Sequence, residues 1–444
     1  MAQLRDDCFA FGGRLIPLDE ALSKAALQFS RALPGRDTVP LSDAAGRVSA
    51  HKVESDGDVP PHPNSAVDGY AVRFADLRPE AETLLPLSGY ATAGDAPVPL
   101  LAGHARRILT GAVLPPGADT IFMDEDATLV EIQSADSAAS VRLPAGLRQG
   151  ANARKQGEDI ARGDQLLHRG QRLSPADVGR LASVGVAEVS VYCRLVVALF
   201  STGNEVRDPG SQRGDGAIYD SNRFTLRGLL ERAGCVVQDL GILPDDALQV
   251  EEALSLASKN ADVILTSGGV SAGDHDIVRH VLERRGEILF WRLAVKPGRP
   301  LALGRFGDCP VVGLPGNPAA AVMMFHVAGL PLIRVLQGEA LPAPLAVPVV
   351  LDFAHRKKPE RIEFVRVRVS PDAQGQLRAE KFPREGAGIL SSIAWATGYI
   401  ALEADRLAVH PGEIGLYTAF DWTFSAQASA DGTDQMQDGA EHGG

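Results

Sequence analysis

The stretch ADVILTSGGVSAGDHDIVRHVLERRG, residues 261–286, decides the expected fold. It begins with an apolar run of strand length, passes through a glycine-rich turn that ends in Asp-His-Asp, and closes with a helical pattern. Two similar units precede it: LVVALFS (195–201) before AIYDSNRFTLRGLLERAG (217–234), and CVVQDLGIL (235–243) before DDALQVEEALSLASKN (245–260). Strands that alternate with helices of this length predict an α/β domain with a parallel sheet and helices on both faces.

The sequence on either side of this domain predicts a multi-domain chain of the α/β and β classes. PLDEALSKAALQFS (17–30) has apolar residues at helical spacing, and LSPADVGRLASVG (173–185) begins with a capping serine, Ser174, before Pro175. Short β-type runs separated by glycine and proline fill residues 84–164 and recur after about residue 337. The expected domains are a discontinuous mixed domain (14–57 and 165–193), a mostly β domain (58–164), the α/β domain (194–340), a β-barrel-like domain (341–425) and a disordered acidic tail (426–444).

Composition narrows the class of protein. The chain has 444 residues, of which 45% are hydrophobic and 23% charged, as is usual for soluble globular proteins. A net charge of -12 argues against a nucleic-acid partner, because phosphate backbones are bound by clustered Lys and Arg. We see no secretory signal and no apolar run of the roughly 18 to 20 residues that a membrane span needs. The four cysteines lie far apart, which favours a reducing, cytoplasmic location and argues against a zinc site.

Acidic residues follow three successive strands of the α/β domain. They are Glu205 of STGNEV, Asp245, and Asp276 at the end of the glycine-rich turn. Loops at the carboxyl ends of parallel strands converge, and glycines there let backbone N–H groups face an anion. Because Mg2+ prefers carboxylates beside substrate phosphates, the pattern predicts a nucleotide or pyrophosphate site with Mg2+. The alternative is an ordinary turn in which Asp245 caps a helix and Glu205 is solvated.

A basic loop follows the third helix. RLAVKPGRP (292–300) places Lys296 and Arg299 around a rigid Pro-Gly turn, and LPGNPAAAV (314–322) then turns from a strand into a helix. Cations on a stiff loop can bind an oxyanion such as phosphate or molybdate. Taken alone, the loop is more typical of a solvated basic turn. The stretches NSAVDGYAVR (64–73), LTGAVLPPGAD (109–119) and ANARKQGEDI (151–160), taken singly, are also typical of β-turns.

Together these stretches resemble one family, the MoeA-type molybdopterin molybdenumtransferases, which are related to the E domains of gephyrin and of its plant counterpart. The resemblance covers about residues 15–425, and eight motifs occur in the family's order. It implies a four-domain subunit that forms a homodimer through the N-terminal domain, with the active site at the subunit interface. It also implies an enzyme that takes adenylylated molybdopterin and molybdate, releases AMP with Mg2+, and leaves molybdenum on the dithiolene. Contact with a molybdopterin adenylyltransferase follows as a partner.

The resemblance also assigns site residues. It implies catalytic roles for Asp68, Thr110, Glu205, Asp245 and Asp276, of which the last three also serve as metal ligands. The implied substrate-binding residues are Arg154, Asp159, Ser267, Gly268, Gly269, Ser271, Lys296, Arg299, Pro315, Asn317, Arg366 and Ser392.

The chain departs from the family's usual motifs at five positions. Val67 stands where Met is usual, Asn204 where Asp is usual and Arg292 where Lys is frequent, and Ala319 and Ala320 stand where a hydroxyl residue is common. Two alternatives to the transferase remain: a molybdopterin adenylyltransferase, which shares the α/β domain, and a non-catalytic scaffold like gephyrin. The flanking NSAVDGYAV and LTGA stretches disfavour the first, and the lack of a long linker disfavours the second.

Overall fold

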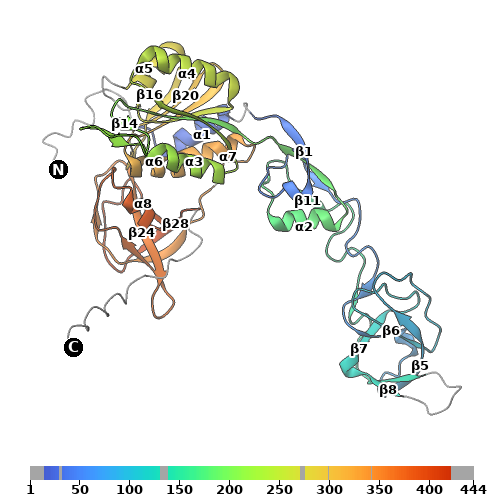
Figure 1. Cartoon of the computed structure of the whole chain (residues 1–444). Coiled ribbons are helices and arrows are strands. Elements are labelled where there is room, and N and C mark those ends of the chain that lie inside the picture. Colours follow the sequence, from blue (N-terminus) through green and yellow to red (C-terminus); the bar gives the residue numbers. More distant parts are fainter. Residues whose placement is uncertain are drawn as a thin grey trace, which may run out of the picture. The chain divides into compact units, whose positions relative to one another are not determined.

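The computed structural model describes residues 15–29, 33–130, 139–270, 276–298, 300–341 and 343–421 (Figure 1). The chain divides into two compact units: one holds the residues up to Arg36 and from Tyr192 onward, and the other is Asp37–Val191. Ser271, Arg299 and the predicted tail lie outside the described residues. The finer division into four domains stays a prediction.

The first unit is built on a mixed sheet with the strand order β16-β13-β17-β21-β20-β18. The first four strands are parallel, as the strand–helix alternation predicts, but β20 and β18 are antiparallel to their neighbours. The sheet is therefore parallel over its first four strands, as expected, and mixed only at this edge. Only two residues, Gly307 and Asp308, join β20 to β21, and so short a connection can form only a hairpin. The strands are β13 (Val196–Thr202), β16 (Val236–Leu243), β17 (Val263–Ser267), β18 (Glu287–Arg292), β20 (Pro300–Phe306) and β21 (Cys309–Leu314).

Helices cover both faces of this sheet, as expected (Figure 1). Alternate residues of β13 serve opposite faces: Val197 and Leu199 belong to one apolar cluster, and Ala198 and Phe200 to the other. α4 and α5 pack in the second cluster, and α1, α3, α6 and α7 in the first. The helices are α1 (Leu18–Phe29), α3 (Asn222–Arg232), α4 (Ala247–Asn260), α5 (Ile277–Arg285), α6 (Pro318–Met324) and α7 (Leu330–Leu336), with a π-helical turn at Phe325–Gly329.

One helical stretch is apolar and long enough to span a membrane by length and composition alone. It runs from Pro318 to Leu336 through α6, the π-helical turn and α7, and 83% of its most apolar window is buried inside the protein. His326 and Arg334 interrupt this stretch, so it is not an unbroken apolar run. The stretch supplies Met323, Met324 and Leu332 to the first cluster, which explains its composition.

The C-terminal part of the first unit is a closed barrel of five strands, in the order β24-β25-β22-β28-β26 with β26 returning to β24. The short strand β19 joins it from the α/β part by parallel pairing with β24. The barrel core contains Val349, Val367 and Ile400. The elements are β19 (Val295–Lys296), β22 (Val347–Leu351), β23 (His355–Arg356), β24 (Ile362–Pro371), β25 (Leu377–Lys381), α8 (Ser391–Trp395), β26 (Gly398–Leu402), β27 (Ala408–Val409) and β28 (Ile414–Ala419); β14 (Val206–Arg207) and β15 (Ile218–Tyr219) form a small pair beside the main sheet.

The unit Asp37–Val191 is mostly β, with one sheet in the order β7-β4-β6-β5-β9-β8. A separate apolar cluster of this unit packs α2 against β2 and β11. Ser174 caps α2 with a full capping box, as the sequence predicts. The elements are β1 (Arg36–Pro40), β2 (Val53–Glu54), β3 (Asn64–Ser65), β4 (Gly69–Val72), β5 (Thr83–Ala91), β6 (Ala105–Ile108), β7 (Thr120–Met123), β8 (Thr128–Val130), β9 (Ser140–Leu143), β10 (Ala153–Arg154), β11 (Gln165–Leu167), α2 (Pro175–Ser183) and β12 (Glu188–Tyr192).

Candidate functional site

Three motifs of the α/β domain meet at the carboxyl ends of its strands. The Asn222 amide, at the start of α3, donates to Ser267 Oγ at 2.7 Å and to the Gly316 carbonyl at 2.8 Å. Ser267 in turn donates to the Pro315 carbonyl at 3.2 Å. YDSN, TSGG and LPGN are thus joined through one buried asparagine, which the sequence analysis quoted but did not select as a site residue.

The two glycines after β17 leave very little room beside Thr202. Gly268 and Gly269 have φ values of 93° and 67°, and a Cβ on either would lie 2.9 Å from Thr202 Oγ1. Both positions therefore require glycine. Four buried oxygens near this edge, Ser201 Oγ, Thr202 Oγ1, Asn222 Oδ1 and Thr266 Oγ1, have no hydrogen-bond partner within the described part of the chain. Buried polar atoms are normally paired, so this edge has polar groups in excess of their protein partners.

The three predicted metal ligands follow their strands as expected. Glu205 is exposed, and Asp245 Oδ2 accepts a hydrogen bond from the Asn204 N–H at 3.0 Å. Asp276 is only 8% exposed and stands at the start of α5, where its carboxylate makes no capping bond. Within the described residues, which omit 271–275, no three His, Cys, Asp or Glu side chains gather closely enough to hold a metal ion. The Mg2+ site stays a prediction.

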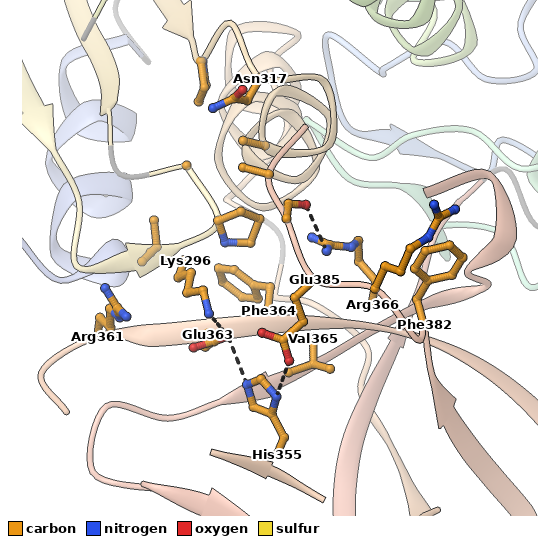
Figure 2. A pocket seen from close by; sticks show the side chains of 18 of the residues that line it. Lys296, Asn317, His355, Arg361, Glu363, Phe364, Val365, Arg366, Phe382 and Glu385 are labelled. Carbon is orange, nitrogen blue, oxygen red and sulfur yellow. Dashed lines mark hydrogen bonds and ion pairs between the residues drawn. The ribbon is translucent and has the colours of Figure 1, made fainter. Parts of the chain in front are cut away.

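A pocket of about 520 Å³ lies where the basic loop and LPGNP meet the barrel (Figure 2). Four residues selected from the sequence line it: Lys296, Pro315, Asn317 and Arg366. The barrel completes it with side chains that the sequence analysis missed: His355, Lys358, Arg361, Glu363, Phe364, Lys381, Phe382, Arg384 and Glu385. For those within residues 355–368, the sequence pattern that could have indicated them is the repeated Lys and Arg of HRKKPERIEFVRVR.

The pocket lining is rich in positive charge. Six Lys or Arg side chains face two carboxylates. Arg366 stands out among them: burial lowers the pKa of its guanidinium, Nη2 donates to the Gly386 carbonyl at 3.3 Å, and Nε has no partner in the described structure. A buried cation with unsatisfied donors is stabilised when an anion binds beside it.

A hydrogen-bonded network crosses one wall of the pocket (Figure 2). Glu363 Oε1 accepts from Lys296 Nζ at 2.7 Å and contacts His355 Nε2 at 3.0 Å. On the far side of the imidazole, His355 Nδ1 lies 3.0 Å from Lys381 Nζ and 3.4 Å from Glu385 Oε1. Burial alone would raise the pKa of Glu363, but the hydrogen bonds from His355 and Lys296 outweigh burial and lower it, so Glu363 is ionised.

In the unit Asp37–Val191, Asp68 and Thr110 form a pair. Asp68 Oδ1 accepts from the Thr110 N–H at 2.7 Å and from its hydroxyl at 2.6 Å, and these bonds lower the pKa of Asp68. The backbone explains why two motifs so far apart in sequence meet: Gly111 N donates to Ser65 O, and Ser65 N to Ala112 O. The bonds from Thr110 keep Asp68 ionised, and the Asp68 side chain is exposed.

The remaining predicted residues are placed as follows. Arg154 lies on β10, opposite Asn64 of β3, and both Arg154 and Asp159 are exposed. Ser392 differs from its expected setting: it is fully buried, and its hydroxyl donates to the Ile389 carbonyl at 2.5 Å rather than facing the pocket. A direct contact between Ser392 and a ligand in that pocket would therefore require α8 to rearrange.

Two of the departures from the usual motifs have visible consequences. Asn204 exchanges hydrogen bonds with Asp245, since its side-chain carbonyl accepts the Asp245 N–H at 3.2 Å. Ala320 lines the pocket without offering a donor, so the pocket relies on its cations instead of a hydroxyl at that point.

The fold and these sites define a class: a multi-domain protein with an α/β domain whose strand ends suit anions, and a barrel that completes a cationic pocket. Three family descriptions match the chain: "MoeA N-terminal region (domain I and II)" over residues 16–185, "Probable molybdopterin binding domain" over 198–335, and "MoeA C-terminal region (domain IV)" over 348–417. A molybdopterin molybdenumtransferase of Haemophilus influenzae is 37% identical over 402 residues, which cover 90% of this chain and 97% of that protein. The chain belongs to the MoeA family.

Other relatives agree with this assignment. A molybdopterin molybdenumtransferase of Synechococcus elongatus is 35% identical over 383 residues, covering 83% of this chain and 91% of that protein. The crystal structure of a molybdopterin biosynthesis moeA protein from Pyrococcus horikoshii superposes with a TM-score of 0.75 at 26% identity, over 92% of this chain and 100% of that chain.

Proposed function

We propose that this chain is a molybdopterin molybdenumtransferase, an enzyme that inserts molybdenum from molybdate into adenylylated molybdopterin with Mg2+-dependent release of AMP. The family and the names of its relatives support this proposal. The observation in the structure that supports it best is the cationic pocket, in which Lys296 and Arg366 meet although they lie on different folding elements.

The pocket suits a tetrahedral oxyanion chemically. Molybdate carries two negative charges and accepts hydrogen bonds, but it offers no coordination site for carboxylate or thiolate ligands in the way a metal cation does. Arg366 is half-buried and supplies an unpaired, buried Nε–H, and Lys296 supplies an ammonium whose side chain is 39% exposed. We assign the pocket to molybdate.

The strand ends of the α/β domain suit the adenylylated substrate. Gly268 and Gly269 allow a close approach of the backbone, and Thr202 and Asn222 offer unpaired oxygens there. The carboxylate oxygens of Glu205, Asp245 and Asp276 are of the hard type that Mg2+ prefers, although these side chains do not gather into a metal site within the described residues. When bound, Mg2+ would neutralise charge on the phosphoanhydride as AMP leaves. The chain's own residues bind and orient the substrate around it.

Asp68 and Thr110 complete the proposed machinery. An ionised, exposed carboxylate fixed by two hydrogen bonds can orient a water or a substrate hydroxyl with little reorganisation. We propose that they act in a homodimer with the active site at the subunit interface, that the enzyme is cytoplasmic, and that it meets a molybdopterin adenylyltransferase that supplies its substrate.

A direct assay tests the proposal. The full-length chain is incubated with adenylylated molybdopterin, molybdate and Mg2+, and released AMP and pterin-bound molybdenum are measured together. We expect both products in equal amounts, and neither when Mg2+ is chelated. Binding of the substrate without AMP release would favour the scaffold, and synthesis of adenylylated molybdopterin from ATP would favour the adenylyltransferase.

Two arginine variants test the role of the pocket. Arg366→Met removes the half-buried guanidinium from the pocket lining, whereas Arg378→Met removes an arginine of the same barrel that pairs with Asp352 instead of lining the pocket. We expect Arg366→Met to abolish molybdenum insertion at low molybdate concentration and Arg378→Met to retain it. Equal activity of the two variants would contradict the assignment of the pocket.

A further inference from the structure

Lys296, a principal cation of the pocket, is paired with a carboxylate of the pocket lining. Its ammonium lies 2.7 Å from Glu363 Oε1, inside the pocket lining. The Glu363 side chain is only 5% exposed, whereas that of Lys296 is 39% exposed. The Lys296 ammonium can therefore turn toward a ligand, whereas the Glu363 carboxylate stays buried in the pocket wall.

The pair is not needed to hold the basic loop against the barrel. β19 pairs with β24 through the backbone, with Val295 opposite Ile362 and Lys296 opposite Glu363. The Ile362 N–H also donates to the Ala294 carbonyl at 2.8 Å. Since these backbone contacts already hold the loop in place, the Glu363 carboxylate is not needed to anchor it.

His355 makes it possible for Glu363 to lose its lysine partner. The imidazole contacts the same oxygen, Oε1, at 3.0 Å and is itself buried. If Lys296 turns to a bound anion, Glu363 keeps His355, so the buried carboxylate does not become wholly unpaired. An unpaired buried charge would be strongly destabilising.

We propose that Glu363 is an internal competitor for the oxyanion: it holds Lys296 when the pocket is empty, and a bound molybdate must take the ammonium from it. Glu363 thereby sets the affinity of the pocket and disfavours anions that interact with Lys296 less strongly than a carboxylate does. This inference rests on the proposed function, because it takes the pocket as the oxyanion site.

The sign of one substitution distinguishes competition from a structural role. Glu363→Gln keeps the shape of the side chain and an oxygen for His355, but removes one negative charge beside the anion. In a partly buried site, one charge a few ångströms from an anion repels it strongly enough to weaken binding on the order of tenfold. Glu363→Gln therefore binds molybdate about tenfold more tightly than wild type, whereas a variant with a damaged pocket binds more weakly.

The experiment measures the molybdate dissociation constant of the full-length chain by isothermal titration calorimetry. Four proteins are compared with wild type: Glu363→Gln, Lys296→Met, the double variant, and Glu413→Gln. Glu413 is a matched control because it is also held by a cation and a histidine, Arg406 and His410, on the same barrel but outside the pocket lining. Melting temperatures verify that each variant is folded.

We expect tighter binding by Glu363→Gln, weaker binding by Lys296→Met and no change in Glu413→Gln. The gain from Glu363→Gln also shrinks in the double variant, because the lysine for which Glu363 competes is absent. Unchanged or weaker binding by a folded Glu363→Gln, with Lys296→Met still weakened, overturns the inference but leaves the proposed function standing. If wild type binds no molybdate, or Lys296→Met binds as wild type does, the oxyanion assignment fails first, and the inference fails with it.

Discussion

The titration of His326 provides a quantitative test of the apolar core that the barrel and the α/β part share. It lies in the π-helical turn Phe325–Gly329, and its ring meets Tyr399 and Phe420 edge-on, with ring centroids 5.6 Å and 5.2 Å away. Burial lowers its pKa from 6.5 to about 4, although Asp421 acts in the opposite direction. His326 is therefore neutral in the folded protein over a range in which an unfolded chain would protonate it.

The lowered pKa sets both the sign and the size of the pH effect. Because the folded pKa lies below the unfolded value, the neutral His326 contributes stability that is fully present above pH 6.5 and is lost as the pH falls toward 4. A shift of about 2.5 units corresponds to about 3 kcal/mol over the whole range, and roughly 2 kcal/mol of it is lost between about pH 7.5 and pH 5. Replacement by phenylalanine removes the titration and keeps an aromatic ring of similar size.

The assay is urea unfolding of wild type and His326→Phe at the two pH values, followed by tryptophan fluorescence. Other titrating groups contribute to both proteins, so the difference between them isolates His326. We expect wild type to lose about 2 kcal/mol more unfolding free energy than the variant as the pH falls. If the two proteins lose stability in parallel, His326 is not buried in neutral form and the reasoning about the shared core is wrong.

Three further predictions follow from local geometry. Gly268→Ala puts a Cβ 2.9 Å from Thr202 Oγ1 at a φ of 93°, so we expect about 1–3 kcal/mol of destabilisation and weaker binding of adenylylated molybdopterin, measured by thermal melting and titration. Ser174→Ala removes a capping box and should cost about 1 kcal/mol of stability without changing molybdate binding. Asp68→Asn and Thr110→Ala should each lower turnover, and the double variant should fall little further because the two residues act as one hydrogen-bonded unit. Additive losses in the double variant would show that they act separately.

Much of the fold was predictable because its signals are local. Apolar runs bounded by glycine gave β13 and β17, and the alternation with helices gave the α/β class. Ser174 caps α2 through side-chain bonds that depend on neighbouring residues alone. The antiparallel edge of the sheet was missed because apolar runs look the same in parallel and antiparallel strands, and only the two-residue connection between β20 and β21 distinguishes them.

The sequence indicated the α/β side of the candidate site, and on the barrel side only Arg366. Lys296 could be selected because a Pro-Gly turn and a second cation accompany it in the sequence. Its partner Glu363 lies 67 residues away, on a barrel strand whose pairing with β19 no local pattern reveals. Ser392 shows what a motif leaves open: the fold turns its hydroxyl to the Ile389 carbonyl, and its role as a ligand contact stays a prediction.

The pairing of Lys296 with Glu363 also indicates that the barrel affects which anions the pocket binds. An α/β loop with two cations would bind abundant anions without discrimination, since screened Coulomb attraction depends mainly on charge. The barrel adds further cations such as Arg366, but it also adds Glu363 and Glu385, each tied to a lysine and to His355. A pocket whose charges are partly balanced before the ligand arrives selects for anions that can displace an existing ion pair. On this argument the barrel determines which anion the α/β loop retains, and the two parts form one site just as they share one apolar cluster.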